Sequence, residues 1–127
     1  MTIMNERKKA LEALLGFEQP VEQLNTALAA FPWDSDTELA FFSVGHAANL
    51  LKRFVTGNTT ASEVENWANA VEGRDDIGFE SANEQLLREF VHELANPLIT
   101  RPLTPERAIE LLKKIEFGFR SKTVKKE

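Results

Sequence analysis

The residues best suited to catalysis or metal binding lie together in the run Glu89-Phe-Val-His92-Glu93. Glu89 and His92 have the spacing that each of two helices contributes to a di-iron site, but the chain has one such pair. His92 and Glu93 also open a pattern like the zinc-protease motif, where Asn96 replaces the second histidine. The other histidine is His46. A metal-dependent enzyme using His92, Glu89 and His46 is therefore an alternative, and we expect His92 to be a half-exposed helix residue.

Nucleophilic catalysis has less support in the sequence. Ser43 and His46 are three residues apart, but no acid is placed to orient the imidazole and no oxyanion hole is evident. The chain has no cysteine, which excludes disulfides and thiolate metal ligands and favours a reducing compartment. No glycine-rich phosphate loop is present. We expect no enzymatic activity and no cofactor.

Charge is distributed unevenly along the 127 residues, whose formal net charge is −5. No Lys or Arg occurs between Ala10 and Leu51, whereas the segment from Arg101 to Glu127 carries eight basic residues against four acidic ones. An acidic body disfavours nucleic acid, whose phosphates require clustered Lys and Arg. It favours a basic protein partner through charge complementarity, unless the carboxylates serve solubility alone.

Two acidic segments supply the candidate partner-binding residues. The first is a turn at 32–36, in which a tryptophan stands beside carboxylates, and tryptophan is a frequent interface anchor. The second is a loop at 72–80, where Ile77 and Phe79 either join the surface or fold back onto the core. The candidates are Trp33, Asp34, Asp36, Glu38, Glu72, Asp75, Asp76 and Glu80.

The helix that precedes the second loop carries the clearest local signals. Thr60 is placed to cap its N-terminus, and Glu63 can reach back to the Thr60 amide. Gly73 follows the last apolar residue, where a left-handed conformation is favoured. Its predicted buried face consists of Val64, Trp67, Ala68 and Val71.

Apolar spacing and breaker residues predict the other helices. They cover about 5–15, 20 to Pro32, 44–55, 81–94, and 104 to Gly118. Val55 and Ile109 are among the residues predicted to face inward. Residues 38–43 fit either a short strand or the first turn of a longer helix. We favour an element boundary near Ser43, with a separate helix that begins at about Val44.

These elements predict an all-α fold, a bundle of five or six helices with short loops and at most one short strand near 38–43. A lone strand has no evident partner, so any sheet should be minor. The length fits a single domain over 1–119, followed by a polar, frayed tail at 120–127.

One segment resembles a known family. The run Leu51-Lys-Arg-Phe-Val-Thr-Gly-Asn-Thr-Thr-Ala-Ser-Glu-Val64 is similar to one found in bacterial colicin-like immunity proteins, which are small, acidic and helical. Phe54, Gly57, Thr60, Ala61 and Glu63 carry the resemblance. It implies a protein that binds a basic nuclease toxin and covers its RNA- or DNA-binding site, with carboxylates mimicking phosphates. The matched residues are structural, so the resemblance assigns no binding residue.

The leading hypothesis is a non-enzymatic, acidic protein-binding module, with toxin neutralisation as its sharpest form. The alternatives are the metal-dependent enzyme and a subunit that buries an apolar face in an obligate complex, and a homo-oligomer is possible. The N-terminal segment lacks the apolar run of a signal peptide, and no stretch reaches the roughly 18 apolar residues of a membrane span. We expect a cytoplasmic protein that binds neither nucleic acid nor membrane.

Overall fold

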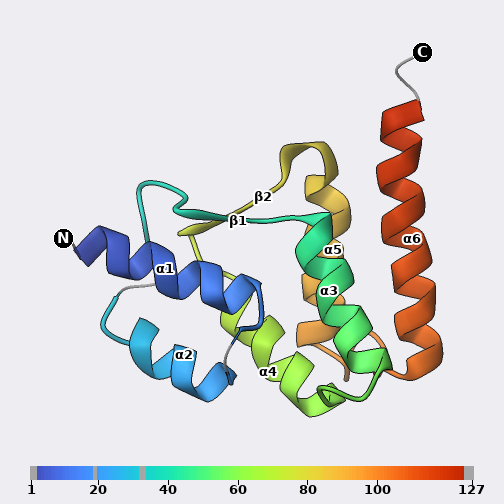
Figure 1. The fold of residues 1–127 in the computed structure, drawn as a ribbon, viewed down its shortest axis with the longest axis horizontal. Coiled ribbons are helices and arrows are strands. Elements are labelled where there is room, and N and C mark those ends of the chain that lie inside the picture. The colour runs from blue at the N-terminus through green and yellow to red at the C-terminus, as the bar shows by residue number, and fades with distance from the viewer. Residues whose placement is uncertain (1–2, 19, 32–33, 125–127) are drawn as a thin grey trace.

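Helices make up most of the molecule, as the sequence predicts. The computed structural model describes residues 3–18, 20–31 and 34–124, with side chains described from residue 6 to residue 116 within these ranges. Its elements are α1 (Ile3–Leu15), α2 (Val21–Leu28), β1 (Ala40–Phe42), α3 (Val44–Val55), α4 (Ala61–Val71), β2 (Ile77–Phe79), the 3-10 turn η1 (Ser81–Asn83), α5 (Glu84–Ala95) and α6 (Pro105–Val124). Figure 1 shows α1 and α2 at one end of the molecule and α6 at the other, where it packs mainly against α3.

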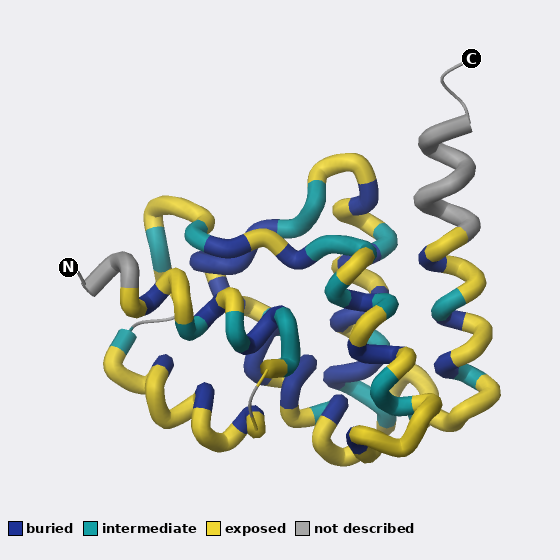
Figure 2. Tube along the Cα trace, in the orientation of Figure 1, coloured by how far each residue is buried: buried dark blue, intermediate teal, exposed yellow. Residues whose placement is uncertain are grey.

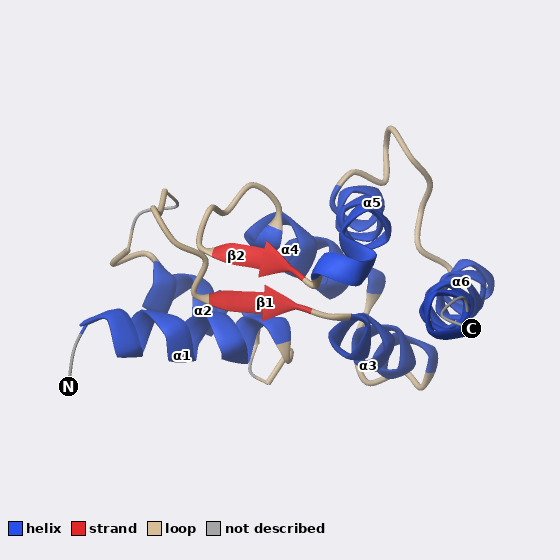
Figure 3. Ribbon diagram, turned by 90° about the horizontal axis from the view of Figure 1, so that it is seen from above, coloured by secondary structure: helices blue, strands red, loops and turns tan. Residues whose placement is uncertain are grey.

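The two strands form a small parallel sheet in which Phe41 pairs with Gly78. The chain crosses from β1 to β2 through α3 and α4, and Figure 3 shows the strands side by side and pointing the same way. The predicted strand within 38–43 is confirmed, but its expected lack of a partner is wrong. Its partner, β2, lies in the segment 72–80 that we assigned to a loop. Three residues with a central glycine are too few to show strand alternation, so this pairing depends on contacts distant in the sequence.

An aromatic cluster around Phe42 fills the core between the sheet and the helices. The rings of His46, Trp67, Phe79 and Phe90 all lie 5.4–6.0 Å from the Phe42 ring, centroid to centroid. Trp67 is fully buried, as predicted, and its indole N–H donates to the Leu14 carbonyl at 2.7 Å. Figure 2 shows the buried residues gathered at the strands and on the helix faces turned toward them.

A buried ion network ties α1 to the start of β2. The Asp76 side chain is 0% exposed and accepts hydrogen bonds at 2.9 Å from both Arg7 and Arg74. Burial raises the pKa of this carboxyl, but hydrogen bonds and charge from Arg74 and Arg7 outweigh burial and lower it overall. The Asp76 carbonyl also accepts from the Leu39 and Ala40 amides, so the same residue holds β1 in register.

The local start and stop signals behave as predicted at α4. The Thr60 hydroxyl accepts from the Glu63 amide at 3.1 Å, and the Glu63 carboxylate accepts from the Thr60 amide at 3.0 Å. Gly73 has a φ of +88°, in the left-handed region that glycine favours. An equivalent capping box, which the sequence analysis did not identify, opens α3 through Ser43 and His46.

Three predictions about helix ends and faces are wrong. Helix α6 continues past Gly118, its predicted end, to Val124, whereas 125–127 lie outside the described residues. A single glycine costs a helix only about 1 kcal/mol, which a long helix tolerates. Val55 and Ile109 are exposed rather than buried, because each lies at the margin of its helix's apolar face. Helix α2 ends at Leu28, before the predicted boundary at Pro32, which the structure does not describe.

Replacing Asp76 with asparagine should destabilise the protein by about 3–5 kcal/mol, since the change leaves two buried guanidinium groups without their carboxylate. Urea unfolding followed by tryptophan fluorescence measures the loss. Asp75→Asn is the matched control, because Asp75 is the exposed neighbour and its substitution should change stability by no more than about 0.5 kcal/mol. Equal effects of the two substitutions would contradict a structural role for the Asp76 network.

Candidate protein-binding cleft

A cleft of about 400 Å³ lies along β2, between the turn that precedes the strand and helix α5. Glu38, just before β1, reaches the same cleft. The remaining lining residues are Glu72, Gly73, Arg74, Asp75, Ile77, Phe79, Arg88, Val91 and His92. The cleft thus combines charged groups from the turn and from α5 with apolar side chains from β2 and α5.

Three of the predicted partner-binding residues line this cleft, although Glu38 is distant in the sequence from the other two. Glu38, Glu72 and Asp75 all line it. Among the described residues, neither Glu38 nor Asp75 forms an ion pair, and both are exposed. Gly78 makes room for Glu38, because a Cβ at that position would collide with the Glu38 carboxylate and the Phe41 ring. The pairing of β1 with β2 is what brings Glu38, just before β1, beside the segment that carries Glu72 and Asp75.

Glu72 organises a hydrogen-bonded group at one wall of the cleft. Its Oε2 lies 3.0 Å from His92 Nδ1, and its Oε1 accepts from the Asn96 side-chain nitrogen, Nδ2, at 3.3 Å. A carboxylate bound to one imidazole nitrogen fixes the ring and leaves the other nitrogen, Nε2, for a further partner. Among the described residues no hydroxyl hydrogen-bonds to His92, so this pair lacks the nucleophile that acyl transfer would need.

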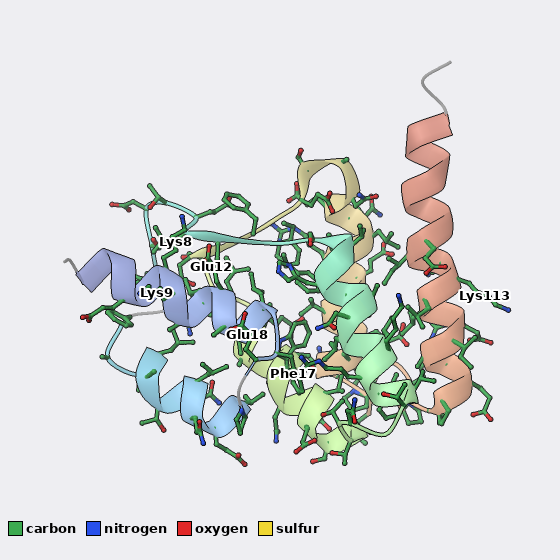
Figure 4. The ribbon with its side chains drawn as sticks, in the orientation of Figure 1. Lys8, Lys9, Glu12, Phe17, Glu18 and Lys113 are labelled. Atoms are coloured by element: carbon green, nitrogen blue, oxygen red, sulfur yellow. The ribbon has the colours of Figure 1, made fainter. Side chains whose placement is uncertain are left out.

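The two arginines of the cleft are held by other acids. Arg74 is buried against Asp76, and Arg88 pairs with Glu84 at 2.9 Å while its guanidinium lies 4.5 Å above the Phe79 ring. Figure 4 shows Lys9 on α1 and Lys113 on α6 pointing outward on opposite sides of the molecule. No ion pair in the described part of the chain joins a lysine to Glu38, Glu72 or Asp75.

Two of the predicted candidates have structural roles instead. Asp76 is fully buried in its ion network, so its assignment to a partner-binding surface is wrong. Glu80 is partly buried, and its Oε1 accepts from the Val44 amide at 3.0 Å, which caps the N-terminus of α3. Sequence spacing shows that these acids share a loop, but not which of them point inward.

The other acidic segment does not reach the cleft. Asp34 and Asp36 are exposed in the loop before β1 and are not among the lining residues. The Asp34 carbonyl accepts from Arg7 at 3.1 Å, which fixes part of this loop to α1. Trp33 lies outside the described residues.

The metal-site alternative gains no support from the geometry. Within the described ranges, no three His, Asp or Glu side chains are grouped as metal ligands. His46 Nδ1 accepts from the Ser43 amide and its ring stacks on Phe42, whereas His92 is bound to Glu72. The Glu89 carboxylate accepts from Gln85 at 3.1 Å on the exposed face of α5.

Sequence reasoning missed the contribution of α5 to the cleft. Arg88 and His92 are four residues apart and therefore share a helix face, which could have been read from the sequence. Their position opposite Glu72 and Asp75 could not, because it follows from how α5 packs on β2 and α4.

No protein-family model matches the chain, and neither a curated protein nor a solved structure shows significant similarity to it. In the part of the chain that the structure describes, no helix combines the length and apolarity required to cross a bilayer. Assignment of a function therefore rests on the cleft and on the sequence.

Substituting glutamine for His46 should make stability less dependent on pH. Burial lowers the pKa of His46 in the folded protein, and the charges of nearby Glu80 and Glu12 oppose this shift. At a pH between the lowered pKa and the ordinary histidine pKa of about 6.5, the unfolded chain therefore binds more protons than the folded protein does. Stability of the native protein should thus fall as the pH drops below about 6.5. Glutamine can preserve the capping box without titrating.

Chemical denaturation of both proteins at pH 7.5, 6.5 and 5.5 measures this difference. The native protein should lose more stability across the series than the His46→Gln variant. Identical losses would show that the His46 environment does not contribute to the pH dependence.

Proposed function

We propose that this protein is a non-enzymatic binding module whose cleft receives a basic segment of a protein partner. The observation that carries this proposal is the convergence of Glu38, Glu72 and Asp75 on one cleft, with Glu38 and Asp75 outside any ion pair among the described residues. Carboxylates without internal partners are available to a cation, and such complementarity gives both specificity and fast association. The partly exposed Phe79 side chain supplies apolar surface that a partner can bury.

The charge pattern supports a protein partner over nucleic acid. The cleft presents carboxylates, and its two arginines are already paired with Asp76 and Glu84. Phosphate backbones require unpaired basic side chains, so the cleft repels rather than attracts them. On this proposal the module works in the cytoplasm and without contact with membranes.

Toxin neutralisation is the sharpest form of the proposal and rests on the resemblance of residues 51–64 to immunity proteins. In the structure this segment forms the end of α3, a turn with Gly57 at a φ of +86°, and the capped start of α4. It supports the helical frame rather than the cleft. The acidic cleft would then cover the cationic substrate-binding surface of a nuclease.

The proposal predicts that reversing charge in the cleft weakens binding to a basic partner recovered from the host. The double variant Glu38→Lys/Asp75→Lys should bind at least about tenfold more weakly, since it sets like charges against each other. Titration calorimetry with the purified pair measures the affinity, and stopped-flow association should slow as salt is added.

The double variant Asp34→Lys/Asp36→Lys is the matched control, because it makes the same charge change outside the cleft. It should retain most of the affinity. If the cleft variant binds as tightly as the native protein, the cleft is not the binding site. If the control variant alone loses affinity, the binding site is the acidic loop before β1 rather than the cleft.

A second candidate function, subunit of an obligate complex, is favoured by one surface feature. Leu98 and Ile99, in the turn after α5, are 99% and 75% exposed. Adjacent apolar side chains that are this exposed often mark a contact surface.

Light scattering of the purified protein tests this second candidate. If the protein is a homo-oligomer, the measured molar mass should exceed that of one chain. The double substitution Leu98→Ser/Ile99→Ser should then reduce the molar mass to that of the monomer. A monomer in both cases would remove the homo-oligomer and leave the cleft as the candidate binding surface.

A further inference from the structure

We propose that the outer edge of β2 binds an extended peptide with alternating basic and apolar residues, which joins the sheet as a third strand. This inference rests on the proposed function and specifies the conformation of the partner segment. It is carried by the hydrogen-bonding pattern of the strand, by the position of the cleft, and by the charges beside it.

The ladder between the strands shows which backbone groups of β2 point away from β1. The Asp76 carbonyl accepts from the Ala40 amide, and the Glu80 amide donates to the Phe42 carbonyl, so the even-numbered residues of this segment face β1. Backbone groups alternate in direction along a strand, and the N–H and C=O of Ile77 and Phe79 therefore face outward. Among the described residues these outward groups have no hydrogen-bond partner.

The unpaired edge opens onto the cleft. Ile77 and Phe79 line it, whereas Gly78, whose backbone faces β1, does not. Phe79 is partly exposed and Ile77 is 3% exposed, so a strand that docks at this edge meets the Phe79 groups first, and the outward backbone groups of both residues lack partners among the described residues. An incoming strand would supply those partners, as in other cases of strand addition to a sheet edge. The opposite edge of the sheet, at β1, is the side on which α1 packs.

The surroundings of the edge select the chemistry of the peptide. Side chains of a strand alternate between the two faces of the sheet. On one face the Glu38 carboxylate lies over Gly78 beside the exposed Phe41 ring, with Asp75 also lining the cleft. On the other face Ile77 and Phe79 continue toward Val91 of α5. A bound strand should thus place Lys or Arg on the first face and β-branched residues on the second.

Three synthetic peptides test this inference with the intact protein. The parent is acetylated and amidated Lys-Val-Lys-Val-Lys-Val, and the other two carry N-methyl groups on every lysine or on every valine backbone nitrogen. Because the N–H groups of alternate residues point to opposite edges of a strand, only one of the two methylated sets would face β2. Fluorescence anisotropy with labelled peptides measures affinity, and amide hydrogen exchange of Ile77 and Phe79 reports the edge directly.

Strand addition predicts that the parent binds, that one methylated peptide loses about tenfold or more in affinity, and that the other binds nearly as well as the parent. The Ile77 and Phe79 amides should become protected, and Glu38→Lys/Asp75→Lys should abolish binding. Equal binding by all three peptides without protection of these amides would overturn strand addition but leave an acidic cleft that binds basic groups. Failure of all basic peptides to bind would overturn both this inference and the proposed function.

Discussion

The buried carboxylate of Asp76 is the interaction on which the arrangement of the sheet depends. Its side chain holds Arg7 from α1 and Arg74 from the turn before β2, and its carbonyl holds the start of β1. Removing charges from water is costly, and the cost is recovered only when each group is bound with good geometry. Here one carboxylate binds two guanidinium groups, so the first helix and the last strand cannot move apart without breaking buried, charged hydrogen bonds.

The same network divides the acidic residues into two kinds. Asp75 and Asp76 are neighbours, but the turn directs one to the cleft and the other to the core. Arg74, the guanidinium nearest in sequence to Glu72 and Asp75, is bound to Asp76 by two hydrogen bonds rather than to either of them. Asp76 and Glu80 thus serve the fold, whereas Glu38 and Asp75 are exposed at the cleft.

Features encoded by adjacent residues could be predicted from the sequence, whereas those created by distant pairing could not. The capping box of Thr60 and Glu63, the bounds of α3 and the burial of Trp67 follow from spacing within a few residues. Strand β2 could not be recognised, since three residues carry little periodicity and their partner lies beyond two helices. Three acids of the cleft, Glu38, Glu72 and Asp75, were candidates from the charge pattern of the sequence. Their position beside α5 could not be predicted, because it follows from packing.

The crossover from β1 through α3 and α4 to β2 also has a kinetic consequence. Arg7 and Asp76 are 69 residues apart, and the two strands of the sheet are separated in the sequence by two helices. Contacts between such distant segments form slowly, because the entropy of a long loop must be lost before any bond is gained. During synthesis, helices α1 to α4 can therefore form while the cleft is still absent, and the surface for a partner matures among the last parts of the molecule.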